Sequence, residues 1–311
     1  MIIGHHLVHG YFKRALSVGA LEHTYCLAGL AQLGKRTLAR LVAAEFLGTT
    51  VGQLRQHADY LYVAREVDEK TGERKRDISI DQARALRSAL GGSSWSGRRV
   101  VVIDEAEYLN ESSANALLKL LEEPPADTII FLLVENEALL LPTICSRVQL
   151  FSLNPVALPE VTAGLEKIHG ISTPLATECA AFSGGRPGKA ITLAQDPGLL
   201  AAQHAALAAW QRLSQESFAD RFAKIEELLD IKTPEDGVSV PLSDWQLWWR
   251  AELLKNLQLT ALAGGPSNGA AVSNRSAAEL VAIIDATQET ASLLRQNIHP
   301  RLALENLVIN F

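Results

Sequence analysis

Residues 100–103 have the sequence VVVI, and two acids, Asp104 and Glu105, follow them directly. A short run that is apolar at every position and rich in β-branched side chains is typical of a strand covered on both faces. Such strands belong to parallel sheets that carry helices on either side. This run therefore predicts an α/β domain, with two carboxylates at the carboxyl end of one of its buried strands.

The neighbouring sequence repeats this alternation of strands and helices. Residues 128–134 (TIIFLLV) predict a second strand, and residues 23–28 (HTYCLA) predict a weaker third one ahead of a turn that contains glycine. Residues 38–46 then have helical character. Together these segments favour a parallel sheet covered by helices.

Local signals place one helix and one hairpin between these strands. Residues 110–123 predict a helix with Asn110 or Ser112 as its N-cap. It ends at Pro124, because a proline cannot continue the hydrogen-bond ladder. Residues 65–77 mix both charge signs around a Thr-Gly pair, which predicts a solvated hairpin tip.

The chain is long enough for two or three domains, since 311 residues exceed the size that a single hydrophobic core usually reaches. Pro155 and Pro159 mark a change of character after the α/β segment. We therefore expect an α/β domain at residues 1–153, a small helical domain at residues 154–200 and an all-helical domain at residues 201–311.

The composition excludes several classes of protein. No apolar run approaches the ~20 residues that a membrane span requires. The amino terminus has no basic flank before an apolar core, so we expect no signal peptide. With only 3 cysteines, widely spaced, neither a disulfide framework nor a zinc site is expected. A reducing cytoplasm is the expected compartment.

The charge balance argues against direct binding of nucleic acid by this chain. The chain carries 29 Lys and Arg against 35 Asp and Glu, a net charge of −6. A protein whose surface holds DNA phosphates is usually basic, because binding draws free energy from displaced counterions. Any nucleic-acid role is therefore expected to run through partners.

Residues 29–37 (GLAQLGKRT) match the GxxxxGK spacing of a phosphate-binding loop, with Gly29 and Gly34 as its glycines. They follow a predicted strand and open a helix. In that context backbone amides at a helix N-terminus face an anion, and Lys35 reaches the outer phosphates. A turn that starts a helix, with a solvated lysine, is the alternative that this motif alone leaves open.

The position after Lys35 departs from a phosphate loop. A Ser or Thr hydroxyl there would ligate magnesium, but the residue is Arg36, and Thr37 stands one position late. The sequence therefore leaves open whether ATP and Mg²⁺ still bind.

Asp104 and Glu105 strengthen the functional interpretation. At the carboxyl end of a buried strand in a P-loop fold, Asp104 would help to hold Mg²⁺ and Glu105 would polarise the attacking water. The alternative is an acidic cap of the helix that follows. The phosphate-loop spacing earlier in the chain favours the first interpretation.

Three further segments make the chain similar to a known family. Residues 113–125 (SANALLKLLEEPP) resemble a clamp-loader signature in which a helix ends in an acidic pair and two prolines, ahead of an apolar strand. Residues 141–147 (LPTICSR) are similar to the family's Ser-Arg-Cys motif, with Val148 in the cysteine position. The opening at residues 3–5 (IGH) fits as well, although His5 stands where glutamine is usual. The chain therefore resembles the clamp-loader subunits of bacterial DNA polymerase III, which belong to the AAA+ superfamily.

This resemblance implies a fold and a set of roles. Residues 1–153 would be an AAA+ P-loop domain, residues 154–200 a helical lid and residues 201–311 a helical collar that joins subunits. Arg147 would act in trans, as an arginine finger in the ATP site of a neighbouring subunit; a structural ion pair at the end of the sheet is the alternative. Asn136 would be a polar sensor of the γ-phosphate.

Two residues separate the types of subunit. Gly188 stands where the ATP-hydrolysing subunits carry a sensing arginine, and Arg36 disrupts the phosphate loop. Both favour the delta-prime type, whose own ATPase activity would be weak or absent. The alternative is an active ATPase, either a gamma/tau-like motor subunit or another AAA+ enzyme. The family's four-cysteine zinc module has no counterpart in residues 45–59, so no zinc is expected.

The same resemblance implies partners: the gamma/tau and delta subunits, and through them the sliding clamp and primed DNA. Trp245, Trp248 and Trp249 recur at helical spacing in the last domain, on one helix face. Base stacking is the alternative, but a stripe of this kind is mostly core or interface, and we interpret it so here. The sharper form of this interpretation is an apolar patch that contacts other subunits.

Overall fold

The computed structural model describes residues 1–68, 70–215, 220–221, 225, 242–259, 265, 275–295 and 298–309. These residues form two compact units. One is Met1–Ala157 with Arg186–Gly188, and the other is Leu158–Gly185 with the described part of Lys189–Phe311. The first unit holds the sheet, and the second is helical.

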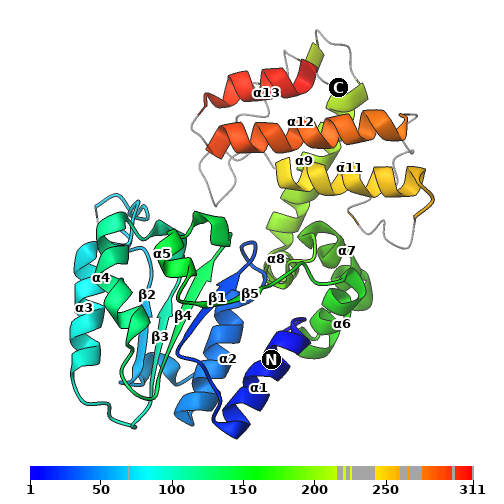
Figure 1. Cartoon of the computed structure of the whole chain (residues 1–311). Coiled ribbons are helices and arrows are strands. Elements are labelled where there is room, and N and C mark those ends of the chain that lie inside the picture. The colour runs from blue at the N-terminus through cyan, green and yellow to red at the C-terminus, as the bar shows by residue number, and fades with distance from the viewer. Residues whose placement is uncertain are drawn as a thin grey trace. The chain divides into compact units, whose positions relative to one another are not determined.

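A five-stranded parallel sheet forms the centre of the first unit (Figure 1). The strand order is β2-β3-β4-β1-β5, and every neighbouring pair is parallel. The strands are β1 (Thr24–Ala28), β2 (Tyr60–Val63), β3 (Arg99–Ile103), β4 (Thr128–Val134) and β5 (Gln149–Ser152). The predicted α/β fold is confirmed, and the three strands expected from the sequence are β1, β3 and β4.

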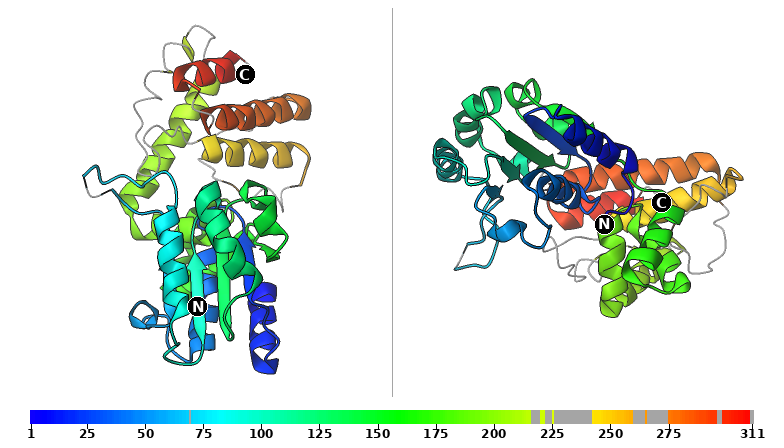
Figure 2. Two further views of the ribbon diagram at one scale, coloured as in Figure 1. Left: turned by 60° about the vertical axis from the view of Figure 1, so that its left-hand side comes forward. Right: turned by 90° about the horizontal axis from the view of Figure 1, so that it is seen from below.

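Helices cover both faces of this sheet (Figure 1, Figure 2). One layer contains α1 (His6–Val18) and α2 (Lys35–Leu47), and the other contains α3 (Ile80–Gly91) and α4 (Glu111–Glu122). The side chains of β3 alternate between the layers: Val100 and Val102 pack with α2, whereas Val101 and Ile103 pack with α3 and α4. Full burial of such a side chain contributes about 1.5–3 kcal/mol, so the central strands anchor both layers.

The sequence explains where α3 and α4 begin. Ser79 and Gln82 form a capping box at α3. Asn110 caps α4 by accepting a hydrogen bond of 2.9 Å from the Ser113 amide. Shorter helices complete the first unit: η1 (Leu54–Gln56), η2 (Ala106–Tyr108), η3 (Glu137–Leu139) and α5 (Pro142–Cys145).

A buried acid fixes the loop that leads into β3. Asp59 is 5% exposed, and its carboxylate accepts hydrogen bonds from the amides of Trp95 (3.0 Å) and Ser96 (2.7 Å). The buried Arg99 guanidinium lies 3.9 Å from Asp59 Oδ1 and donates to carbonyl oxygens at the end of α3. The loop is therefore held by a charge pair whose polar groups are hydrogen-bonded, as burial requires.

The second unit is helical throughout the part that the structure describes. Its helices are α6 (Leu158–His169), α7 (Thr173–Ser183), α8 (Pro187–Gln195, whose first residues belong to the first unit), α9 (Pro197–Gln215), α11 (Leu242–Asn256), α12 (Ala277–Arg295) and α13 (Pro300–Ile309). α11 and α12 run side by side (Figure 1, Figure 2). Among the described residues, no helix is long and apolar enough to cross a membrane. The division into a lid at residues 154–200 and a collar at residues 201–311 stays a prediction.

The three tryptophans of α11 lie in the core of the second unit. Trp245 and Trp249 have no exposed surface, and Trp248 is 6% exposed. The centres of the Trp248 and Trp249 rings lie 4.3 Å apart, and the Arg275 guanidinium lies 5.4 Å from the centre of the Trp249 ring. The interpretation of this stripe as core is therefore confirmed, whereas its sharper form, a contact between subunits made by these tryptophans, is not supported by their burial. Their large indole rings are packed inside their own chain, where they bury the most apolar area.

Candidate functional site

The predicted nucleotide-site residues come from three loops at one edge of the sheet. β3, β4 and β1 are parallel neighbours, so the segments that follow them meet at the carboxyl ends of these strands. Residues 29–37 follow β1, Asp104 and Glu105 follow β3, and Asn136 follows β4. The fold therefore brings together the residues that the sequence spacing singled out, apart from Arg147.

The loop between β1 and α2 has a backbone path that needs its glycines. Gly29 has φ 149°, and its amide donates to the Val134 carbonyl at 3.1 Å. Gly34 has φ 103° and stands at the start of α2. A β-carbon on Gly29 would lie 2.4 Å from the carbonyl oxygen of Leu153. The loop can pass between the ends of β4 and β5 only without a side chain at this position.

Gly29→Ala should lower the free energy of unfolding by about 2–3 kcal/mol, because it adds both backbone strain and a clash with a backbone oxygen. Gly48 is the matched control: it has φ 67°, but an added β-carbon would meet no atom within 4 Å. Gly48→Ala should cost only about 1 kcal/mol. Urea unfolding of the full chain measures both variants, and equal losses would contradict the steric argument.

The loop lysine is turned back onto its own loop. Lys35 Nζ donates to the carbonyl oxygens of Gly29 and Leu30, the second at 3.0 Å. Burial lowers the pKa of Lys35, while the nearby carboxylates of Glu135 and Glu107 act in the opposite direction. In this conformation the ammonium group satisfies loop carbonyls and does not extend toward a phosphate.

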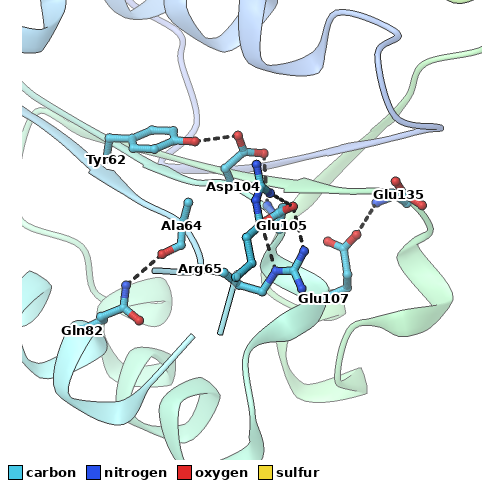
Figure 3. A network of polar contacts seen from close by, with 9 residues as sticks. Tyr62, Ala64, Arg65, Gln82, Asp104, Glu105, Glu107 and Glu135 are labelled. Atoms are coloured by element: carbon cyan, nitrogen blue, oxygen red, sulfur yellow. Dashed lines mark hydrogen bonds and ion pairs between the residues drawn. The ribbon is translucent and has the colours of Figure 1, made fainter. Parts of the chain in front are cut away.

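Arg36 places a positive charge where a phosphate loop would use a hydroxyl. Its guanidinium lies 4.5 Å from the centre of the Tyr62 ring, and its Nε is 3.9 Å from Asp104 Oδ2. The Tyr62 hydroxyl donates to the same carboxylate oxygen at 2.8 Å (Figure 3). Burial, and then the charge of Asp104, raise the pKa of Tyr62, so the phenol stays protonated at neutral pH.

These residues do not fit a magnesium ion. The Arg36 guanidinium already faces Asp104. The second ligand expected for magnesium is a hydroxyl at position 36, but the nearest hydroxyl in the sequence is that of Thr37, which is exposed in the first turn of α2. A magnesium ion would have to approach Asp104 against the charge of Arg36, which opposes its binding.

Glu105 is held by two arginines of the hairpin at residues 65–77. Arg65 donates from Nε to Oε2 and from Nη2 to Oε1, both at 3.1 Å (Figure 3). Arg74 forms an ion pair with Oε1. A bridge between Val67 and Arg74 closes the hairpin. The predicted hairpin with a solvated tip is confirmed, because residues 70–76 are exposed; two of its arginines also reach back to the edge of the sheet.

Two opposing effects set the protonation of Glu105. Burial acts to raise its pKa, but the hydrogen bonds and charges of Arg65 and Arg74 outweigh burial and hold the pKa below its usual value. Glu105 also has a left-handed backbone, with φ 56°. An ionised carboxylate whose two oxygens are both hydrogen-bonded to guanidinium groups is badly placed to accept a proton from water.

Glu107 belongs to the same edge and is a residue that sequence reasoning did not single out. Its Oε1 accepts a hydrogen bond of 3.1 Å from the Glu135 amide (Figure 3), and its Oε2 is buried without a hydrogen-bond partner among the described residues. Burial raises the pKa of Glu107, against that hydrogen bond. Its place three positions after Asp104 was the available signal. In the described part of the chain, no group of three or more His, Cys, Asp or Glu could hold a metal ion.

Asn136 lies just past the end of β4, beside the strand that leads into the phosphate loop. Its Oδ1 accepts a hydrogen bond of 2.9 Å from the Ala138 amide and so caps η3. The side chain is exposed. Its role as a sensor of the γ-phosphate stays a prediction.

Gly188 lies against the phosphate loop, in the same compact unit. Its amide donates to the Gln32 carbonyl at 2.8 Å, and Gln32 has a left-handed backbone with φ 64°. A β-carbon on Gly188 would lie 2.9 Å from this oxygen and 3.0 Å from Gln32 Cβ. An arginine could therefore stand here only if the loop moved, so the loop as folded leaves no room for a sensing arginine.

Arg147 is bound by its own chain. Its Nε donates to Glu122 Oε1 at 2.7 Å, and its Nη2 lies 2.5 Å from the same oxygen. Its Nη1 donates to the Thr143 carbonyl at 2.7 Å and to the Ser146 hydroxyl at 2.9 Å. The ion pair that the sequence offered as the alternative is thus present, and the role as a finger stays a prediction.

Arg147 and the phosphate loop lie at opposite ends of the β1–β5 pair. Arg147 precedes β5 by two residues, and Gln149 at the start of β5 pairs with Tyr25 near the start of β1. The phosphate loop begins at Gly29, after the end of β1. The strand from Tyr25 to Gly29 rises roughly 13 Å at about 3.3 Å per residue. The Arg147 side chain, directed to Glu122, therefore does not serve the loop of its own chain.

The first half of the chain matches a known family. Residues 4–157 match the family model described as "DNA polymerase III, delta subunit". The DNA polymerase III subunit delta' of Pseudomonas aeruginosa is 35% identical over 185 residues, which cover 53% of this chain and 53% of that protein. The subunit delta' of Escherichia coli K12 is 32% identical over 149 residues, which cover 48% of this chain and 43% of that protein.

Similarity extends to another type of subunit. The DNA polymerase III subunit tau of Salmonella typhimurium is 33% identical over 177 residues, which cover 54% of this chain and 27% of that protein. The chain thus spans about half, or less, of the length of the curated relatives it matches.

Proposed function

We propose that this chain, whose residues 4–157 match a DNA polymerase III subunit family and which is 32–35% identical to delta' subunits over about half its length, is a clamp-loader subunit of the delta-prime type, within the AAA+ superfamily, and serves in a DNA polymerase III clamp loader. There it hydrolyses little or no ATP of its own and supplies Arg147 to the ATP site of a neighbouring subunit. Its direct partners are the gamma/tau and delta subunits, and through them it helps to load the sliding clamp onto primed DNA. This work takes place in the cytoplasm.

The proposal of little or no ATP hydrolysis rests on one observation: arginines engage both acids at the edge of the sheet, Asp104 and Glu105. The Glu105 carboxylate is bound by Arg65 and Arg74, and the Asp104 carboxylate is faced by Arg36. A water-activating base needs an oxygen within hydrogen-bond reach of the water, and a magnesium ligand needs a carboxylate that is open to the ion. Neither acid offers this, which favours a subunit without turnover of its own.

The loop itself supports the same conclusion. Lys35 Nζ donates hydrogen bonds to the carbonyl oxygens of Gly29 and Leu30, and the Gly188 amide donates to the Gln32 carbonyl. When the polar groups of a loop are hydrogen-bonded to each other, the loop gains less free energy on binding a phosphate, because these internal hydrogen bonds must first be broken.

The position of Arg147 supports the second part of the proposal. It lies at the opposite end of the β1–β5 pair from the loop of its own chain, and its side chain is 32% exposed. A guanidinium offers a planar fork of donors that matches a phosphate. A residue so placed can act on a nucleotide only if another subunit brings that nucleotide to it.

An active ATPase is the second candidate, and the similarity to a tau subunit favours it. A motor subunit would need a magnesium ligand after the loop lysine and a sensing residue near Gly188. Arg36 and the contact between Gly188 and Gln32 oppose both requirements. The delta-prime interpretation therefore accounts for more of the site.

The purified chain should hydrolyse ATP no faster than the buffer background, because both acids are engaged by arginines. Lys35→Ala is the control and should leave this low rate unchanged. Nucleotide titration should show no gain in affinity when Mg²⁺ is added, since Arg36 opposes the ion. Robust turnover that Lys35→Ala abolishes would contradict the proposal and favour the motor subunit.

A further inference from the structure

Glu122 is the main partner of Arg147, and the pair joins two segments that are far apart in the sequence. Glu122 is the last residue of α4, and Arg147 follows α5. One carboxylate oxygen, Oε1, accepts from Nε at 2.7 Å and lies 2.5 Å from Nη2. The carboxylate therefore binds the edge of the guanidinium formed by Nε and Nη2, which is the edge that includes the nitrogen attached to the aliphatic part of the side chain.

The remaining contacts fix the rest of the guanidinium. Nη1 donates to the Thr143 carbonyl at 2.7 Å and to the Ser146 hydroxyl at 2.9 Å. A guanidinium has five N–H groups. Among the described residues, one N–H on Nη2 therefore remains without a partner, at the end of the group that is remote from the stem. Because the Arg147 side chain is 32% exposed, this N–H can meet a group from outside the chain.

We propose that Glu122 is a positioning residue, which holds the Arg147 guanidinium in the orientation that presents its remaining N–H to a phosphate of the neighbouring subunit. This inference rests on the proposed function of Arg147. A long arginine side chain samples many rotamers when it is unrestrained, and ordering it during the reaction slows the reaction. A side chain that is fixed beforehand avoids this loss.

A carboxylate beside an arginine finger can also act against it, by neutralising its charge and competing with the phosphate. The geometry favours positioning. Glu122 binds the Nε–Nη2 edge through a single oxygen, and it leaves the outer N–H of Nη2 uncovered. A competing carboxylate would instead cover the end that meets the phosphate.

The next residue in the sequence provides a matched control. Glu123 carries the same charge and is exposed. Its amide, rather than its carboxylate, closes the end of α4 by donating to the Lys119 carbonyl at 3.0 Å. Glu123→Gln therefore removes one negative charge from the same place without removing the partner of Arg147.

Nitrogen-15 relaxation of the Arg147 Nε–H in the full chain tests the hold directly. In Glu122→Gln the heteronuclear NOE of this group should fall and its exchange with water should accelerate, because the charged acceptor is gone. In Glu123→Gln both quantities should match the wild type. An Nε–H that stays equally ordered in Glu122→Gln would overturn the proposal.

A reconstituted clamp loader tests the consequence. Glu122→Gln should lower kcat at the ATP site served by Arg147 by roughly tenfold, less than the ~10²-fold that a 1 Å misplacement can cause. The KM for ATP should change little, because the group acts on the transition state. Glu122→Asp keeps the charge and should restore part of the rate. A rate equal to that of Glu123→Gln, or a rate that rises, overturns the proposal.

The role of Arg147 as a finger and the positioning role of Glu122 can be tested separately. If Arg147→Ala leaves turnover of the complex unchanged, the proposed function of Arg147 is wrong, while the relaxation measurement still decides whether Glu122 holds the side chain. If Arg147→Ala slows turnover but Glu122→Gln does not, only the positioning role is wrong.

Discussion

Arg147→Ala should lower ATP turnover at the neighbouring site by about 10³-fold or more, the effect typical of removing an arginine finger from a phosphoryl-transfer site. The guanidinium would otherwise stabilise the charge that develops on the transferring phosphoryl group. Folding and assembly should change little. The pair that the substitution removes is partly exposed, with 32% of the Arg147 and 47% of the Glu122 side chain accessible, and such pairs contribute about 0–1 kcal/mol.

The measurement is ATPase activity and clamp loading on primed DNA by the reconstituted complex. Only one of several active sites would lose its finger, so total ATPase activity should fall by the share of that site. Clamp loading should fall further if the sites act in concert. Arg14→Ala, which removes an exposed arginine of α1, is the control and should change neither quantity. Unchanged values in Arg147→Ala would make Arg147 a structural ion-pair residue only.

Asp59→Ala should lower the free energy of unfolding by about 3–5 kcal/mol, the range for removing one partner of a buried charge pair. The substitution leaves the buried Arg99 guanidinium without its carboxylate and the amides of Trp95 and Ser96 without an acceptor. Asp81→Ala removes an exposed acid from the first turn of α3 and should cost less than about 1 kcal/mol. Denaturant unfolding of the full chain compares the two, and similar losses would argue against a buried pair.

The same acid gives the stability a pH dependence of definite sign. Burial acts to raise the pKa of Asp59, but hydrogen bonds from Trp95 and Ser96 outweigh it and lower the pKa. A carboxyl with a lowered folded-state pKa contributes stability above its unfolded pKa, and this is lost as the pH falls through the folded pKa. The stability gap between wild type and Asp59→Asn should therefore be full at neutral pH and shrink below about pH 4. A gap that widens in acid would contradict this assignment.

The central strands could be predicted because they are apolar at nearly every position. Residues 128–134 form β4 with the predicted bounds, and β3 differs from the prediction only by the addition of Arg99. β2 and β5 were not predicted. Each lies at an edge of the sheet, is four residues long and is partly exposed, so neither shows a continuous buried run. Edge strands of this length have too few residues for their periodicity to stand out.

The phosphate loop and its two acids could be located from spacing, but the partners of those acids could not. Arg65 and Arg74 reach Glu105 from 40 and 31 positions away, and Tyr62 reaches Asp104 from 42 positions away. Mixed charges are ordinary in a surface hairpin, and no periodicity marks which of them face inward. Only the parallel pairing of β2 with β3 brings the start of the hairpin beside the acids.

β1 is synthesised early, yet it finds its partners late. Thr24 pairs with Ile130 in β4, and Tyr25 pairs with Gln149 in β5. At about 5–20 residues per second, a ribosome needs roughly 5–20 seconds to make the hundred or so residues that separate β1 from β4. During this time a strand whose five residues all end up buried has no sheet to join. The nascent chain therefore offers a hydrophobic segment to chaperones, and slower translation ahead of β4 would prolong that exposure.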